Sequence, residues 1–378
     1  MNKILCGNCL EVMKDFKDNT FDSVVTDPPY GLRFMGKGWD HGVPGVDYWK
    51  EVLRVAKPGA FLLAFGGTRT FHRLAVAIED AGWEIRDTIG WIYGSGFPKS
   101  HNVGKAVDKL QGNEREVTGK SKGRSSAIHG GGQSVGEDDI LTKGTSEWEG
   151  WGTALKPAWE PIIMARKPFN GTVAENVLKY GTGGINIDES RVGTDVVKTT
   201  AYKTLGDGIK YGKSKPFDES EERIGRFPAN LIHDGSEEVM ELFPDTNKQA
   251  KCKTDNKSGW QSELVGGKIK APVERKLYLD DDNGGNASRF FYCAKASKQD
   301  RDECNNHPTV KPTKLMRYLV KLVTRKGGLV LDPFCGSGST CKACVLEEYN
   351  YVGIDLDPEY CKIAENRTNA ISIQTKLW

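Results

Sequence analysis

The sequence predicts an α/β fold: a mostly parallel β-sheet with helices on both faces. Apolar runs typical of buried strands alternate with helical patterns over residues 1–100, and the same alternation returns from residue 311 onward. Such alternation is typical of strand–helix units whose crossovers cover a parallel sheet. With 378 residues, the chain has room for one large domain with insertions or for two domains.

In the first hundred residues, short apolar segments and amphipathic segments follow one another in turn. Glycine and proline stops separate them, for example Gly66-Gly67 after an apolar strand and Gly82 after a helix. The predicted strands are residues 3–6, 21–26, 60–65 and 84–93, and the predicted helices are residues 10–16, 47–56 and 70–81.

The regular pattern resumes near the C-terminal end of the chain. An apolar stripe predicts a helix over residues 312–324, and Gly327-Gly328 ends it. A strand over 328–331, a glycine-rich turn, a helix over 340–347, a strand over 351–355 and a helix over 358–368 follow.

Between these parts, from residue 94 to about residue 298, Gly, Ser, Lys and Asp dominate and periodicity is weak. Residues 119–152 and 198–220 read as long loops, whereas residues 158–166 form an apolar island that should return to the sheet. We therefore expect a core domain in two parts, residues 1–100 and 299–378. A large irregular insertion, residues 101–298, separates them and has the length typical of functional or disordered segments.

Asp27-Pro28-Pro29-Tyr30 directly follows the predicted strand at residues 21–26. Neither proline can donate a backbone hydrogen bond, so the strand ladder stops there. The stiff turn displays a carboxylate, a proline carbonyl and an aromatic ring, a set suited to holding a flat base by its amino group and stacking on its face. The alternative is an ordinary loop start with Tyr30 as a lid on the core.

A second candidate site is the glycine turn between the strand at 328–331 and the next helix. It reads Asp332-Pro333-Phe334-Cys335-Gly336-Ser337-Gly338-Ser339-Thr340 and lacks both the dinucleotide and the triphosphate loop patterns. Asp355 ends the following strand, where an acid commonly accepts hydrogen bonds from ribose hydroxyls. The arrangement predicts a nucleoside-binding half, and the alternative is a plain turn with Asp355 as a helix cap.

Charge and cysteine content limit the remaining classes. Lys plus Arg number 53 and Asp plus Glu 51, but residues 248–276 and 295–326 are locally basic, which suits phosphate contacts or a solvated surface. The absence of an apolar signal region or membrane-length run predicts a soluble, cytoplasmic protein. Nine scattered cysteines predict reduced thiols. Whether the pairs Cys6/Cys9 and Cys341/Cys344 meet stays open, and no metal site is expected.

Taken together, these motifs resemble those of the amino-methylating DNA methyltransferases that use S-adenosyl-L-methionine. The tetrad at Asp27 is similar to the family's catalytic motif and residues 332–340 to its cofactor motif, in the order of the permuted β group. Gly7-Asn8-Cys9 resembles an N-terminal turn in which Asn8 replaces the family's acid. His307-Pro308-Thr309-Val310-Lys311-Pro312 resembles the element before the cofactor strand, and residues 180–188 and 226–230 look like phage and prophage members.

The resemblance implies a Rossmann-like methyltransferase mixed sheet, in which residues 3–6 pair beside residues 351–355 and complete the cofactor half. It also implies that the cofactor is bound by one group of residues and the DNA base by another. The cofactor group is Asn8, Lys311, Asp332, Pro333, Phe334, Gly336, Gly338, Thr340 and Asp355; the base and DNA group adds Phe34 and Lys99 to the tetrad of Asp27, Pro28, Pro29 and Tyr30.

The chemistry implied is base flipping from double-stranded DNA followed by direct methyl transfer. Asp in the first tetrad position favours adenine over cytosine within the family, so adenine-N6 methylation is the leading hypothesis and cytosine-N4 methylation the alternative. More distant alternatives are a catalytically silent DNA-binding protein and an RNA or protein-glutamine methyltransferase. Residues 101–298 would recognise the target. The DNA sequence, a homodimer and a partner restriction endonuclease are left open.

Overall fold

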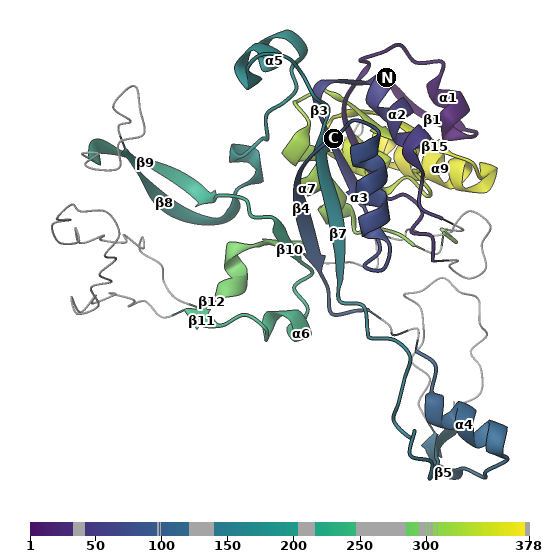
Figure 1. Cartoon of the computed structure of the whole chain (residues 1–378). Coiled ribbons are helices and arrows are strands. Elements are labelled where there is room, and N and C mark those ends of the chain that lie inside the picture. The colour runs from purple at the N-terminus through teal and green to yellow at the C-terminus, as the bar shows by residue number, and fades with distance from the viewer. Residues whose placement is uncertain are drawn as a thin grey trace, which may run out of the picture.

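The computed structural model describes residues 1–32, 42–96, 98, 100–120, 140–202, 216–246, 285–294, 300, 302, 305–307 and 309–374. Among these residues the centre of the molecule is a nine-stranded sheet, in the order β1-β15-β14-β2-β3-β7-β4-β10-β13 (Figure 1). Its strands are β1 (Asn2–Cys6), β2 (Phe21–Thr26), β3 (Ala56–Phe65), β4 (Glu84–Ile92), β7 (Trp159–Arg166), β10 (Leu231–His233), β13 (Tyr292–Cys293), β14 (Leu329–Asp332) and β15 (Asn350–Asp355).

The sheet is mixed, as the resemblance implied. Neighbouring strands run parallel, except that β7 pairs antiparallel with both β3 and β4. β7 contains most of the apolar island predicted at residues 158–166. Because it runs opposite to its neighbours, its first residue, Trp159, pairs with Ile92 at the carboxyl end of β4. The start of β7 therefore lies at the edge where the parallel strands end.

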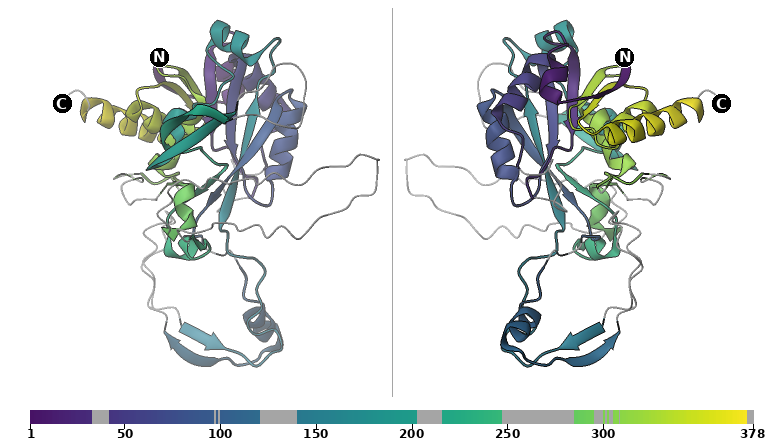
Figure 2. Two further views of the ribbon diagram at one scale, coloured as in Figure 1. Left: turned by 90° about the vertical axis from the view of Figure 1, so that its left-hand side faces the viewer. Right: turned by 90° about the vertical axis from the view of Figure 1, so that its right-hand side faces the viewer.

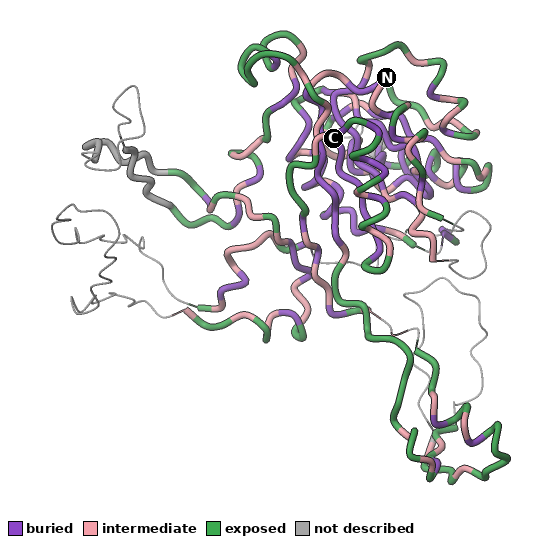
Figure 3. The backbone as a smooth tube through the Cα atoms, viewed as in Figure 1, coloured by how far each residue is buried: buried purple, intermediate pink, exposed green. Residues whose placement is uncertain are grey.

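Helices cover both faces of the sheet because successive strand residues point to opposite sides. Val24 and Leu62 pack with Trp49 in one core, whereas Val25 and Leu63 pack with Leu319 in the other. The first core is covered by α1 (Cys9–Met13), α2 (Val46–Val55) and α3 (Phe71–Asp80), and the second by α7 (Thr313–Val323) and α8 (Ser339–Leu346). Figure 3 shows the buried residues concentrated in this region.

The N-terminal strand pairs beside β15, which confirms the strand pairing expected from the permuted motif order. β1 pairs in parallel with β15 from Asn2 opposite Tyr351 to Cys6 opposite Asp355. The last helix, α9 (Pro358–Gln374), follows β15, and its Cys361 Sγ lies 3.8 Å from the Leu5 carbonyl oxygen. The two ends of the chain thus build one side of the sheet together.

The insertion contributes more strands than the sequence pattern predicted. Beyond β7, it adds β10 and β13 to the main sheet, and it forms two hairpins, β5 (Glu116–Lys120) with β6 (Ile140–Lys143) and β8 (Val192–Tyr202) with β9 (Pro216–Arg226). The prediction of loops over residues 119–152 and 198–220 is therefore wrong where these strands are described. The backbone N–H and C=O groups of these strands are paired across each hairpin. Residue composition alone does not reveal such pairing.

The hairpin of β5 and β6 forms a small lobe with α4 (Val103–Gln111) (Figures 1 and 2). Arg115 ties the lobe together, because its guanidinium pairs with Asp108 and with Glu149. Two extended segments connect this lobe to β4 and β7, and Figure 2 shows it standing apart from the sheet. The remaining elements of the insertion are α5 (Val173–Tyr180), α6 (Glu237–Met240), β11 (Asp245–Thr246) and β12 (Gly285–Asn286).

Two predicted boundaries moved for local reasons. The helix predicted over 10–16 ends at Met13, because Asp15 and Phe16 make tighter three-residue turns with Val12 and Met13. β3 begins at Ala56 rather than after Gly59, whose N–H donates to the Lys167 carbonyl across the sheet at 3.0 Å.

The basic run at 248–276 lies outside the described residues. None of the helices in the described part is long and apolar enough to cross a membrane.

Candidate active site

The tetrad begins where β2 ends, in the middle of the sheet between β14 and β3. Parallel neighbours finish at the same edge, which brings Asp27 next to Asp332 at the end of β14. The two strand ends are tied by a hydrogen bond in which the buried Thr26 hydroxyl donates to Asp332 Oδ1 at 2.6 Å. The tetrad and the glycine turn, about three hundred residues apart in sequence, are therefore joined at their bases.

Tyr30 is fixed on two sides. The Thr70 hydroxyl donates to the Tyr30 carbonyl at 2.7 Å, and Gly67 lies against the ring, since a Cβ added there would stand 3.0 Å from Tyr30 Cδ2. The Tyr30 hydroxyl lies 2.8 Å from Asp27 Oδ1 and 2.9 Å from Glu160 Oε2. Burial, and then the two carboxylates, raise the pKa of Tyr30 well above its usual range, so the hydroxyl stays a donor.

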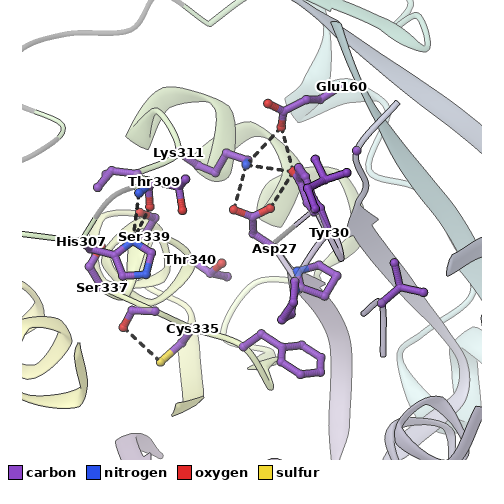
Figure 4. A pocket seen from close by; sticks show the side chains of 18 of the residues that line it. Asp27, Tyr30, Glu160, His307, Thr309, Lys311, Cys335, Ser337, Ser339 and Thr340 are labelled. Carbon is purple, nitrogen blue, oxygen red and sulfur yellow. Dashed lines mark hydrogen bonds and ion pairs between the residues drawn. The ribbon is translucent and has the colours of Figure 1, made fainter. Parts of the chain in front are cut away.

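Lys311 joins the same group from the segment before α7 (Figure 4). Its Nζ lies 2.8 Å from Asp27 Oδ2, 3.1 Å from Glu160 Oε2 and 3.1 Å from the Tyr30 hydroxyl. Burial opposes its charge, but the carboxylates of Asp27 and Glu160 outweigh burial and raise the pKa of Lys311. The sequence grouped Lys311 with the cofactor residues, whereas its ammonium group points at the tetrad.

The glycine turn is held in shape by backbone conformations that favour glycine. Gly336 has φ 49° and Gly338 has φ 77°, both in the left-handed region. The Gly336 N–H donates to Asp355 Oδ2 at 2.8 Å, and the Asp357 N–H donates to Oδ1 at 3.0 Å. Burial raises the pKa of Asp355, and these two backbone donors oppose that rise. The carboxylate keeps lone pairs for further donors.

One cavity of about 2320 Å³ connects the two motifs. Ligand pockets commonly measure roughly 300–1,000 Å³, so this volume is large enough for a cofactor and a base together. Of the predicted site residues in the described part, those that line it are Asn8, Asp27, Pro28, Pro29, Tyr30, Lys311, Asp332, Pro333, Phe334, Gly336, Thr340 and Asp355.

The other predicted residues fall elsewhere. Gly338 caps the start of α8 behind the cavity wall, where a Cβ would stand 2.7 Å from Ala364 Cβ. Asn8 lines the cavity, and its side chain caps α1 by accepting from the Leu10 N–H at 3.0 Å. Phe34 and Lys99 lie outside the described residues. Trp91 and Tyr93 also line the cavity.

Glu160 is the site residue that the sequence reasoning missed. It is the second residue of β7 and lies 130 positions from Tyr30 in sequence. Its carboxylate receives the Tyr30 and Tyr93 hydroxyls, the latter at 3.3 Å, as well as the Lys311 ammonium group. The sequence predicted that residues 158–166 return to the sheet but not their direction, and it is the antiparallel run of β7 that brings Glu160 to the edge where the parallel strands end.

No metal centre emerges from the described residues, in which no group of three or more His, Cys, Asp or Glu side chains is placed to hold an ion. The two Cys-x-x-Cys pairs occupy different places. Cys6 ends β1 beside Cys361, whereas Cys341 and Cys344 are buried in α8. All the cysteines in the described part are free thiols.

Comparison with known proteins places this site in context. The chain is 22% identical over 326 residues to the type II methyltransferase M.HindIII of Haemophilus influenzae, a match that covers 85% of this chain and 67% of that protein. A shorter match to the DNA adenine methyltransferase YhdJ of Escherichia coli is 35% identical over 71 residues, and it covers 19% of this chain and 24% of YhdJ. Apart from M.HindIII, the matched relatives are covered over 23% to 33% of their own length.

Among solved structures, the cytosine-N4-specific PvuII DNA methyltransferase aligns with a TM-score of 0.44 at 14% identity, over 98% of this chain and 90% of that one. The family model described as DNA methylase matches residues 21–366, which include the tetrad, the insertion and the glycine turn. The cofactor of this family is S-adenosylmethionine. Since the match spans most of the sequence, the chain belongs to the DNA methylase family.

Proposed function

We propose that this protein transfers a methyl group from S-adenosylmethionine to the exocyclic amino group of adenine in double-stranded DNA. The observation that carries the proposal is the shared cavity, in which the tetrad and the glycine turn with Asp355 face the same space of about 2320 Å³. One part presents acceptors and an aromatic ring, and the other presents a backbone turn and an acid. These are the groups needed for an amino-bearing base and a nucleoside cofactor.

The cofactor end suits a ligand with a ribose and little negative charge. Asp355 keeps free lone pairs for hydroxyl donors, and Gly336 lets His307 pack against the turn, since a Cβ there would stand 2.8 Å from His307 Nε2. Phe334 and Tyr48 line the same wall with their ring centroids 6.0 Å apart, and the ring of the buried Trp49 lies 6.1 Å from that of Phe334. S-adenosylmethionine bound there would supply an electrophilic sulfonium methyl group.

The tetrad prepares the amino group to attack. The lone pair of an exocyclic amine is delocalised into the base ring, which makes the amine a poor nucleophile. The Asp27 carboxylate and the Pro28 carbonyl accept the two amino hydrogens, which localises the lone pair and aims it, while Tyr30 stacks on the flipped base. The amine nitrogen would take the methyl group as its bond to the sulfonium sulfur breaks, which would leave a neutral thioether, and one amino proton would pass to solvent. Asp27 thus acts by orientation and electrostatics, and no covalent bond to the enzyme forms.

Adenine is preferred to cytosine because Asp occupies the first tetrad position, and the relative YhdJ is named a DNA adenine methyltransferase. The DNA would be held at the cavity mouth, where Arg69 and Lys156 are lining residues with exposed side chains. The insertion, residues 101–298, would supply target recognition.

Nucleoside analysis tests the proposal. The protein is incubated with double-stranded DNA and methyl-labelled S-adenosylmethionine, and the DNA is digested to nucleosides. Label is expected in N6-methyldeoxyadenosine. Label in N4-methyldeoxycytidine would replace adenine by cytosine as the substrate, and DNA that stays unlabelled over a range of sequences would contradict the whole proposal.

A further inference from the structure

The carboxylate that should hold the base is already engaged by the protein's own donors. The Tyr30 hydroxyl lies 2.8 Å from Asp27 Oδ1, and Lys311 Nζ lies 2.8 Å from Oδ2 (Figure 4). Each oxygen keeps a further lone pair, but an incoming amino group must compete with these two donors for the carboxylate. Lys311 is the stronger competitor, because its ammonium group carries a full positive charge beside the carboxylate.

Lys311 cannot simply leave Asp27 for empty space. Its side chain is 10% exposed, and an unpaired ammonium group at such a depth is costly. A second carboxylate is within reach, because Glu160 Oε2 lies 3.1 Å from Lys311 Nζ and 2.9 Å from the Tyr30 hydroxyl. Both donors that occupy Asp27 thus touch the same oxygen of Glu160.

Glu160 is itself held firmly enough to serve as this second acceptor. It lies on β7, where its backbone pairs with Trp91 of β4, and its other oxygen is 3.3 Å from the Tyr93 hydroxyl. Its side chain is 18% exposed, so its charge is little screened by water. Three donors surround the Glu160 carboxylate, namely Tyr30, Tyr93 and Lys311. Tyr30 belongs to the tetrad, and Lys311 contacts it.

We propose that Glu160 is a positioning residue, which takes Lys311 away from Asp27 when the amino group of the base enters. Lys311 then moves between two neighbouring carboxylates without losing a counter-charge. Asp27 then gives up its contact with Lys311 and accepts a hydrogen bond from the substrate amino group, at little cost in free energy. This inference rests on the proposed function, because it assigns Glu160 a part in the same reaction.

A double-mutant cycle tests the proposal. In Glu160→Gln the ammonium group has Asp27 as its one remaining counter-ion in the cluster, so Asp27 is less available. We expect the single-turnover rate of methyl transfer to fall about tenfold or more, with the dissociation constants for S-adenosylmethionine and DNA unchanged. In a Lys311→Met background no ammonium group competes for Asp27. There, adding Glu160→Gln should change the rate by less than about twofold.

Glu84→Gln is the matched control. Glu84 binds Arg166 at the opposite end of β7, at 2.8 Å, and is 42% exposed. This variant should transfer methyl groups at the wild-type rate. The melting temperature of each variant verifies that it is folded.

Four results would overturn the inference. Wild-type activity in Glu160→Gln, or equal losses from Glu160→Gln with and without Lys311, would remove Glu160 from this role and leave the proposed function intact. A wild-type protein that transfers no methyl group to DNA would overturn the proposed function, and this inference with it. Loss of folding in Glu160→Gln, seen as a collapsed melting temperature, would assign Glu160 a structural role instead.

Discussion

Asp332 is a deeply buried carboxylate at the joint between the two motifs, with 3% of its surface exposed. It accepts from the Thr26 hydroxyl at 2.6 Å and from the Phe334 N–H at 3.2 Å. Burial raises its pKa from 3.8 to about 7, and the hydrogen bonds from Thr26, Thr340 and Phe334 oppose that rise. The folded protein thus holds a proton on Asp332 at pH values where the unfolded chain has lost it.

The sign of the resulting stability effect follows from this raised pKa. The contribution of Asp332 is fully present below pH 3.8 and is lost as pH rises to about 7. In the wild type, the free energy of unfolding should therefore fall by up to about 1.4 kcal/mol per pH unit within that window. An Asp332→Asn variant should lack this fall. Urea unfolding of both proteins, measured without cofactor at several pH values, gives the difference. Parallel pH curves for wild type and variant would show that Asp332 ionises normally.

The site residues differ in how far the sequence reveals them. Asp27 and Tyr30 stand in one short motif after an apolar strand, so their proximity is local and was predictable. Glu160 and Lys311 meet that motif through the order of strands in the sheet, and their contacts span 130 and 281 positions. No local pattern encodes a meeting of that kind.

At the scale of elements, the turn before α8 depends on glycine for two separate reasons. Gly338 has φ 77°, and its missing Cβ leaves room for Ala364 Cβ, which would otherwise lie at 2.7 Å. Gly112, at the end of α4, has a similar φ of 70° but no described atom within 4 Å of the position of a Cβ. Both glycines thus adopt a left-handed backbone conformation, but of the two it is Gly338 whose Cβ would also meet a neighbouring side chain.

Alanine substitutions at Gly112 and Gly338 therefore measure how much the contact with Ala364 contributes to the free energy of unfolding. Gly112→Ala should lower the free energy of unfolding by roughly 1–2 kcal/mol through backbone strain alone. Gly338→Ala should lower it by about 1–3 kcal/mol more, because α8 and α9 are forced apart, and should also weaken S-adenosylmethionine binding. Calorimetric titration of the cofactor and denaturant unfolding give both quantities. Equal losses in the two variants would show that the turn is not packed against α9.

Element positions were largely predictable, but their order in the sheet was less so. Apolar runs bounded by glycine and proline marked β2, β3, β14 and β15 within a few residues, because buried strands need continuous apolar side chains. β10 and β13 have three and two residues, too few for any periodicity to appear. The place of β7 between β3 and β4 follows from tertiary pairing, which no single segment encodes.

At the scale of the whole molecule, the lobe of α4, β5 and β6 is the part least involved in the core. Its two connections meet near Ser100 and Thr153, where the His101 N–H donates to the Thr153 hydroxyl at 2.9 Å and the Thr153 N–H donates to the Ser100 hydroxyl at 2.9 Å. Its own ion pairs, between Arg115 and the acids Asp108 and Glu149, stay within the lobe. The sheet and the cavity do not depend on it for their packing.

Replacing residues 102–151 by a short Gly/Ser linker should therefore leave the core folded. We expect the melting temperature to shift by a few degrees at most and the S-adenosylmethionine affinity to stay unchanged. DNA binding, followed by fluorescence anisotropy, should weaken, because the lobe belongs to the proposed target-recognition insertion. A variant that binds and methylates DNA as wild type does would exclude this lobe from recognition.

The central claim is that the Asp27 carboxylate orients the amino group that receives the methyl group. The most direct test is the single-turnover rate of methyl transfer to DNA by Asp27→Ala, measured together with the dissociation constant for S-adenosylmethionine. We predict a fall in rate on the order of a hundredfold or more, as for other groups that stabilise a transition state electrostatically, with cofactor affinity within about twofold of wild type. Transfer by Asp27→Ala at the wild-type rate would contradict the account.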